Sequence, residues 1–164
     1  MTGILSSNEV GWVLMQSGLS PFSLDTEMFQ IVREGENYIV HTDRLPEIYI
    51  EKSVSLELFD YNHENWIVCF AMDRVNLRRT PVVVYRGASS DTITFRICLY
   101  PDSGEALSEN LDGSFVLIEQ AIEAFGHACE VATREYENDP MSKLLEGLSD
   151  PSPDSPWLNG KRSS

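Results

Sequence analysis

Seven apolar residues in the second half of the chain have the spacing of one face of a long helix. Successive members are 3, 4, 3, 4, 3 and 4 residues apart, and they are Phe115, Ile118, Ile122, Phe125, Cys129, Ala132 and Tyr136. Because an α-helix has about 3.6 residues per turn, these side chains form one stripe. Asp112 or Ser114 can cap the helix. The stripe must be buried, either in a coiled coil or across a sheet.

The residues before this helix predict a sheet. Two β-rich runs, 28–33 and 38–42, flank a short loop that contains glycine and asparagine, which is typical of a hairpin. The runs 82–86 and 92–100 predict a second hairpin, and the latter run alternates apolar and polar residues throughout. With strands available, we expect the striped helix to lie across a sheet rather than in a coiled coil.

A middle strand and two shorter helices complete the pattern. Residues 54–59 alternate as a half-buried strand does, and residues 48–50 are either a separate strand or its lead-in. A first helix is expected from Ser7 to Ser17, and a second from a cap at Asn62 to about Asn76. We interpret three arginines at the end of the second helix as charges that complement its dipole rather than as a binding patch; they are Arg74, Arg78 and Arg79.

The predicted order of elements is therefore α-β-β-β-α-β-β-α. Antiparallel hairpins and a long striped helix favour a two-layer α+β fold, in which a sheet of about five strands carries the C-terminal helix on one face. We expect residues 1–137 to form a single domain. Residues 138–164 are rich in proline, serine and aspartate and predict an acidic, disordered tail.

The charge of the chain argues against polyanionic partners, that is, nucleic acids and anionic membranes. Twelve basic residues stand against 26 acidic ones, which gives a net charge of −14. Nucleic acids and anionic membranes are both bound through Lys and Arg, which neutralise phosphate groups. We therefore expect neither nucleic acid nor a membrane as a partner. The longest apolar run, residues 66–72, is also far shorter than the roughly 20 residues that span a bilayer.

The cysteines favour a reducing compartment. Cys69, Cys98 and Cys129 are odd in number, widely spaced and flanked in part by apolar residues, which is typical of buried free thiols. The first fifteen residues lack a basic region, and Glu9 interrupts the stretch that a signal peptide keeps apolar. We expect a cytoplasmic protein.

No local motif for catalysis, metal binding or a cofactor occurs in the sequence. His41, His63 and His127 are not at ligand spacing from one another or from a cysteine. There is no nucleophile elbow, phosphate-binding loop or dinucleotide-binding glycine motif. We predict no catalytic residues, no metal and no cofactor. The alternative is a small hydrolase or transferase whose site is dispersed along the chain.

Two segments are candidates for protein binding. The first helix is apolar nearly all round, so we expect Trp12 and Met15 to contact a second copy in a homodimer. The tail has an i, i+3, i+4, i+7 pattern that is typical of a helix bound in a groove, formed by Met141, Leu144, Leu145 and Leu148. The same pattern fits an extension of the last helix that folds back on its own domain, and we prefer this second interpretation.

The order of elements resembles the YbjN family of candidate bacterial sensory transduction regulators, which shares its architecture with the class I type III secretion chaperones. The best local match is Ala71–Tyr85, where a helix ends in Asn76 and leads into a strand of valines. The strand Ile93–Tyr100 and the closing helix Phe115–Tyr136 continue the likeness, which covers about residues 7–137. The resemblance implies a non-enzymatic protein-binding module, chaperone-like or a regulatory adaptor in the bacterial cytoplasm, often homodimeric and without catalytic residues.

Overall fold

The fold comes from a computed structural model, which describes residues 3–59, 64–139 and 141. The described elements are α1 (Ser7–Gln16), β1 (Phe22–Ser23), β2 (Met28–Arg33), β3 (Glu36–Arg44), β4 (Glu47–Ser55), the 3-10 helix η1 (Leu56–Leu58), α2 (Asn65–Asn76), β5 (Val82–Arg86), β6 (Thr92–Leu99) and α3 (Gly104–Asn138). The strands form one antiparallel sheet in the order β1-β2-β3-β4-β6-β5. The predicted two-layer α+β fold is confirmed.

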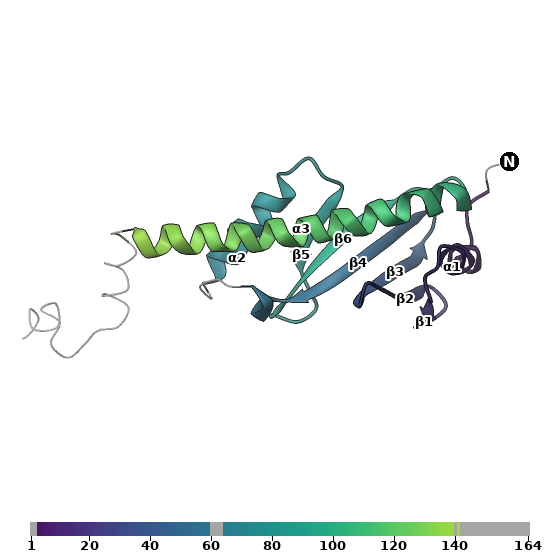
Figure 1. Ribbon diagram of the computed structural model, residues 1–164, viewed down its shortest axis with the longest axis horizontal. Helices are drawn as coiled ribbons and strands as arrows, with labels where there is room; N and C mark the ends of the chain where they lie inside the picture. Colours follow the sequence, from purple (N-terminus) through teal and green to yellow (C-terminus); the bar gives the residue numbers. More distant parts are fainter. Residues whose placement is uncertain (1–2, 60–63, 140, 142–164) are drawn as a thin grey trace, which may run out of the picture.

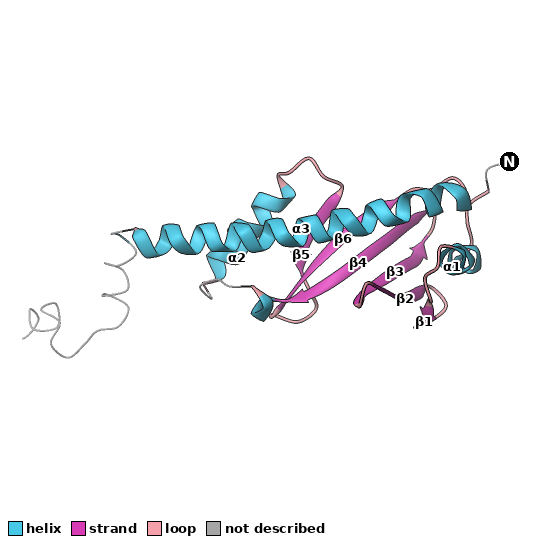
Figure 2. Ribbon diagram, in the orientation of Figure 1, coloured by secondary structure: helices cyan, strands magenta, loops and turns pink. Residues whose placement is uncertain are grey.

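The helices share one apolar core with one face of the sheet. Helix α3 crosses the sheet and extends beyond it at its C-terminal end, with α1 near its N-terminal end and α2 beside its C-terminal half (Figure 1). Burial alternates along β3 and β4, so every second side chain enters this core. The opposite face presents the alternate side chains of the strands, which include polar residues and the exposed Val32 and Val83, and none of the described helices packs on it (Figure 2).

Helix α3 confirms the predicted stripe but begins earlier than the predicted caps. Its N-cap is Ser103, whose side chain accepts a hydrogen bond from the backbone N–H of Ala106 at 3.1 Å. Asp112 and Ser114 therefore lie inside the helix, and Ser114 is buried and donates to the carbonyl of Asn110. Thirty-five residues make α3 about 52 Å long, at about 1.5 Å per residue.

The strands differ from the prediction in three places. The two-residue strand β1 has no alternating pattern of its own, and it makes the sheet six-stranded rather than about five. Strand β4 is one continuous strand that includes both 48–50 and residues 54–55. The predicted strand over 54–59 is wrong beyond Ser55, because the Ser55 side chain caps η1 by accepting from the N–H of Glu57. The first hairpin turns at Glu34 and Gly35, which both have positive φ.

The cysteines are free, as predicted, but only one of them is fully buried. Cys129 lies in the core, and burial raises the pKa of its thiol to about 12. Cys98 is half-buried and Cys69 is exposed on α2. The prediction of three buried thiols is wrong for Cys69, because its apolar neighbours Val68 and Phe70 point to other sides of the helix.

Helix α2 ends at Asn76, as predicted, and this residue protects the edge strand of the sheet. Its side chain donates to the carbonyl of Val84 at 2.9 Å and accepts from the N–H of the same residue at 2.8 Å. Strand β5 pairs only with β6, so these bonds satisfy backbone groups that an edge strand otherwise presents to other chains. The N-cap of α2 is Glu64, and the predicted cap Asn62 lies outside the described residues.

We predict that Asn76→Ala lowers the free energy of unfolding by about 1–3 kcal/mol, because two hydrogen bonds are lost at one backbone unit. The variant is also expected to aggregate faster than the parent, since the edge of β5 is then unprotected. Urea denaturation and turbidity during mild heating measure the two effects. Asn8→Ala changes an exposed asparagine and should leave both unchanged. An unchanged Asn76→Ala variant contradicts the protective role.

The C-terminal segment falls almost entirely outside the described residues. Leu144, Leu145 and Leu148 are among residues 142–164, so the structure does not test their predicted role, and Met141 is exposed. Within the part of the chain that is described, no helix is both long and apolar enough to cross a membrane.

Candidate protein-binding groove

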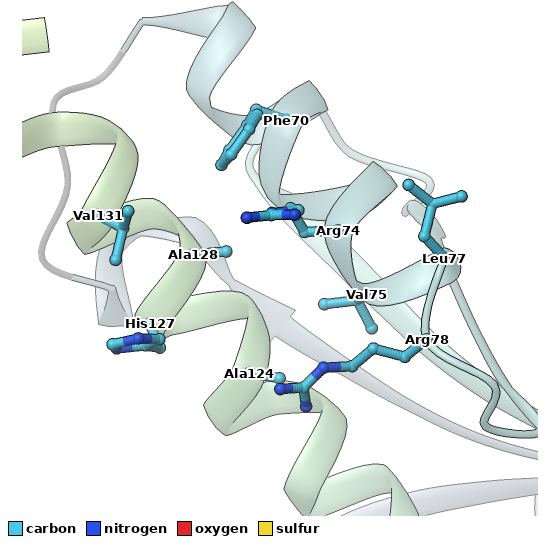
Figure 3. Close-up of a pocket in the computed structure, with 9 residues that line it drawn as sticks. All are labelled: Phe70, Arg74, Val75, Leu77, Arg78, Ala124, His127, Ala128 and Val131. Carbon is cyan, nitrogen blue, oxygen red and sulfur yellow. The ribbon is translucent and has the colours of Figure 1, made fainter. Parts of the chain in front are cut away.

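A groove with a volume of about 390 Å³ lies between α2 and the C-terminal half of α3 (Figure 3). The two helices are antiparallel, since Trp66 at the start of α2 contacts Tyr136 near the end of α3, with ring centroids 5.7 Å apart. We call this feature the α2–α3 groove. Its lining residues are Phe70, Arg74, Val75, Leu77, Arg78, Ala124, His127, Ala128 and Val131.

The apolar floor of the groove follows from helical spacing. In α2, Ala71 and Val75 enter the core, and the neighbouring face of the same helix carries Phe70 and Arg74 toward α3. The small side chain of Ala124, like that of Ala128 one turn later, leaves space between the helices instead of filling it. The floor of the groove is therefore apolar and shallow.

Two guanidinium groups extend over this floor. Figure 3 shows the side chain of Arg74 crossing from α2 toward Ala128, and that of Arg78 ending beside Ala124. The guanidinium of Arg74 also lies 5.5 Å from the centroid of the Phe70 ring, which is cation–π geometry. The groove thus combines positive charge with apolar surface.

The charge on these arginines is not neutralised within the described chain. Ion pairs with carboxylates are formed by four other arginines, Arg33, Arg44, Arg96 and Arg134, and Arg86 donates to the side chain of Asn65. Among the described residues, no ion pair or hydrogen bond joins another side chain to Arg74, Arg78 or Arg79. In a chain of net charge −14, three unpaired arginines at one helix end are a local exception.

Sequence reasoning located these arginines at the end of the second helix but interpreted them as charges that complement its dipole rather than as a binding patch, and it missed the groove. Arg74 lies in the last turn of α2, in agreement with its interpretation as a helix-end charge. The packing of α3 alongside α2 places Arg74 and Arg78 over an apolar floor, and no local pattern reports that packing. A cationic rim on apolar surface is suited to an acidic, amphipathic peptide, whose carboxylates pair with guanidinium groups.

The predicted contact residues of the first helix lie elsewhere. Trp12 and Met15 are 60% and 57% exposed on α1, beside the N-terminal end of α3, whereas Val10 and Leu14 of the same helix are in the core. Burial in the core thus accounts for the apolar residues on one side of α1, and it leaves Trp12 and Met15 on the other side exposed. The structure does not bring Trp12 and Met15 together with the α2–α3 groove or with Met141.

A second polar cluster lies on the uncovered face of the sheet, around Glu51. This carboxylate accepts hydrogen bonds from His41 Nε2 at 2.9 Å, from the Tyr85 hydroxyl at 2.5 Å, and from Arg96. The Arg96 guanidinium lies 4.7 Å from the ring centroid of Tyr49 and 5.0 Å from that of Tyr85. We call these five residues the Glu51 cluster.

The Glu51 cluster neutralises its own charges. Burial alone would raise the pKa of Glu51, but hydrogen bonds from His41, Tyr85 and Arg96 outweigh it and lower the pKa to about 2. The cluster was missed at the sequence level because its members come from four strands and meet only through strand register. Unlike the groove, it holds a carboxylate for its arginine, so it is a structural network.

A buried lysine on the covered face is a further feature that sequence reasoning missed. Lys52 Nζ contacts Glu119 Oε1 of α3 at 2.5 Å and Glu36 Oε2 at 3.0 Å, and the Tyr38 hydroxyl also donates to Glu119. Burial raises the pKa of Glu119, but the bonds from Lys52 and Tyr38 outweigh it and lower the pKa. These bonds fix α3 on β3 and β4. No group of three or more His, Cys, Asp or Glu that could hold a metal occurs among the described residues.

Comparison with known proteins gives one match, and it is structural. No protein-family model matches the sequence, and no curated protein matches it. The crystal structure of YbjN from E. coli, described as a candidate transcription regulator, superposes with a TM-score of 0.58, covering 76% of this chain and 96% of that chain. The chain has a YbjN-like fold. With 12% sequence identity, the YbjN-like fold is what the match establishes, and the resemblance inferred from the order of elements is confirmed at that level.

Proposed function

We propose that this protein is a non-enzymatic protein-binding module, a chaperone-like or regulatory adaptor of the bacterial cytoplasm, and that it binds its partner in the α2–α3 groove. One observation carries the proposal. The guanidinium groups of Arg74 and Arg78 lie over an apolar floor in a strongly acidic chain, and neither has a carboxylate partner among the described residues. The YbjN-like fold supports a regulatory role, since YbjN is described as a candidate transcription regulator.

The chemistry of the groove specifies the partner as a short acidic and apolar segment. Carboxylates form charge-assisted hydrogen bonds with Arg74 and Arg78, and apolar side chains cover Ala124 and Ala128. A volume of about 390 Å³ accommodates a few side chains, as a single helix or extended peptide presents them. Nucleic acid also carries negative charge, but the remainder of this chain repels a long polyanion.

Peptide display on the full-length protein tests this proposal. A random peptide library is selected on the wild-type chain and counter-selected on the Arg74→Glu/Arg78→Glu variant. We expect enriched peptides to combine Asp or Glu with Leu or Phe, and to bind the wild-type chain at least about tenfold more tightly than the variant, because reversed charges repel their carboxylates. Raising the salt concentration should weaken the binding.

Arg44→Glu is the matched control, because Arg44 is exposed on β3 and lies outside the groove. Selected peptides should bind this variant as they bind the parent. Peptides that are basic, or that bind the parent and the double variant equally, would contradict a role for the groove.

We also propose that the protein is a homodimer whose contacts include Trp12 and Met15, because both side chains are large, apolar and exposed on α1. Light scattering at micromolar concentration is expected to give about twice the 18.5 kDa mass of the chain. The Trp12→Glu/Met15→Glu variant should give the monomer mass, since two charges would be buried without partners. A monomeric wild-type chain would rule out the homodimer.

A further inference from the structure

We infer that residues 144–158 of the same chain occupy the α2–α3 groove when no partner is bound, so that a partner must displace this segment. The inference rests on the proposed function, because the arginines and the apolar floor that bind the partner would also bind the segment. It assigns a role to Leu144, Leu145 and Leu148, whose spacing is typical of a groove-binding helix.

The first argument is the position at which α3 ends. Along α3, the last residue that lines the groove is Val131. The helix ends at Asn138, which is about 10 Å farther along its axis at about 1.5 Å per residue. Trp66 packs against Tyr136 in this region, so the start of α2 lies beside the point where the chain leaves α3 (Figure 1). The C-terminal segment therefore starts next to one end of the groove.

The second argument is the length of chain available. Leu144 is six residues beyond Asn138. Six residues reach at most about 20 Å, at about 3.3 Å each, and the helical conformation of Met141 shortens that maximum. With residues 139–140 extended and a helical rise of about 1.5 Å for each of the other four, the reach is about 13 Å, which still exceeds the distance of about 10 Å back to Val131. The far end of the groove, at Ala124, is about 21 Å from Asn138 along the helix. Residues 144–158 are long enough to extend over the whole groove.

The third argument is charge complementarity. Residues 144–158 contain three acidic residues and no lysine or arginine; the acidic residues are Glu146, Asp150 and Asp154. The unpaired Arg74 and Arg78 of the groove are their complement. Such a pairing places carboxylates opposite guanidinium groups that have no carboxylate partner in the described chain.

The fourth argument is that the order of side chains is the same in the segment and in the groove. A segment that folds back from Asn138 first passes the apolar end of the groove, at Phe70 and Val131, and then Arg74 and Arg78 (Figure 3). In the segment, the three leucines likewise precede Asp150 and Asp154. Apolar side chains thus meet apolar surface and acidic side chains meet the arginines.

Hydrogen exchange of the full-length chain, measured by mass spectrometry with millisecond mixing, tests the inference. Amides of residues 144–158 are expected to exchange about tenfold more slowly in the wild-type chain than in Arg74→Glu/Arg78→Glu, as for a segment that is bound about nine-tenths of the time. The Arg44→Glu control should keep the wild-type rates.

A charge exchange makes the test specific. In the Arg74→Glu/Arg78→Glu background, adding Asp150→Arg and Asp154→Arg should restore the slow exchange, because the reversed charges attract again. Folding of every variant is checked by far-ultraviolet circular dichroism. Restoration cannot come from a general effect of the substitutions on stability.

Three outcomes would overturn the inference: fast exchange in the wild-type chain, slow exchange that persists in the double variant, and protection that rises with protein concentration. The second outcome would mean that the segment is protected by a mere continuation of α3, and the third that a second copy supplies the segment. None of them decides the proposed function. Selected acidic peptides that still bind the groove would support that function without the inference, whereas protected residues 144–158 without peptide binding would support the docking alone.

Discussion

Phe125→Ala is expected to lower the free energy of unfolding by about 3–5 kcal/mol, the range found when a buried aromatic side chain is removed. Phe125 has no exposed surface and lies midway along the apolar stripe of α3. Its ring centroid is 4.9 Å from that of Phe59 and 5.8 Å from that of Phe95 in β6. Alanine would leave a cavity between α3 and the sheet that these rigid neighbours cannot fill.

Glu123→Ala is the matched control, since Glu123 is exposed on the same helix and off the stripe. Its effect should stay within about 0.5 kcal/mol, as for an ordinary surface substitution. Urea denaturation of the two variants beside the parent provides the measurement. Similar small losses in both variants would mean that α3 is not packed on the sheet as described.

Acidification is expected to remove about 3 kcal/mol of stability through Glu51 alone. Hydrogen bonds from His41, Tyr85 and Arg96 lower the pKa of this carboxyl from 4.5 to about 2, despite the opposing effect of burial. A carboxyl with a lowered pKa in the folded state contributes stability that is fully present above pH 4.5 and is lost as the pH falls toward 2. At about 1.4 kcal/mol per pH unit, the difference amounts to about 3 kcal/mol.

Glu51→Gln isolates this contribution, because glutamine does not titrate and the other carboxyls titrate in both proteins. We expect the variant to be less stable than the parent at pH 7, and the two to converge as the pH falls from 4.5 to 2. Urea denaturation at half-unit pH steps measures both curves. Parallel curves over this range would show that the Glu51 cluster does not hold the carboxylate charged.

Periodicity predicted the elements of this fold, and the elements predicted its class. The stripe from Phe115 to Tyr136 identified α3, and the alternation in residues 92–100 identified β6, because each pattern reports how one element faces the core. The prediction failed where periodicity was absent and where a side-chain cap overrode it. Strand β1 is too short to alternate, and η1 is formed by a side-chain cap at Ser55 that interrupts an alternating run.

The candidate sites were harder to predict because they depend on contacts between elements. Arg74 and Arg78 were visible among the three arginines at the end of the second helix, but their position over Ala124 and Ala128 depends on how α2 packs on α3. Lys52 offered one usable indication. It occupies a core position in the alternation of β4, between Ile50 and Val54, and a charge at such a position requires a buried partner, which is Glu119.

The pairing of β4 with β6 at the centre of the sheet has a consequence for synthesis of the chain. The side chains of Ser53 and Thr94 are hydrogen-bonded across this pair although 41 residues separate them, so the sheet cannot close before β6 has left the ribosome. The face it then presents is apolar, and α3, which covers it, begins only at Gly104. A growing chain that does not yet include α3 therefore exposes its future core to solvent, and this interval is when the protein is most prone to aggregate.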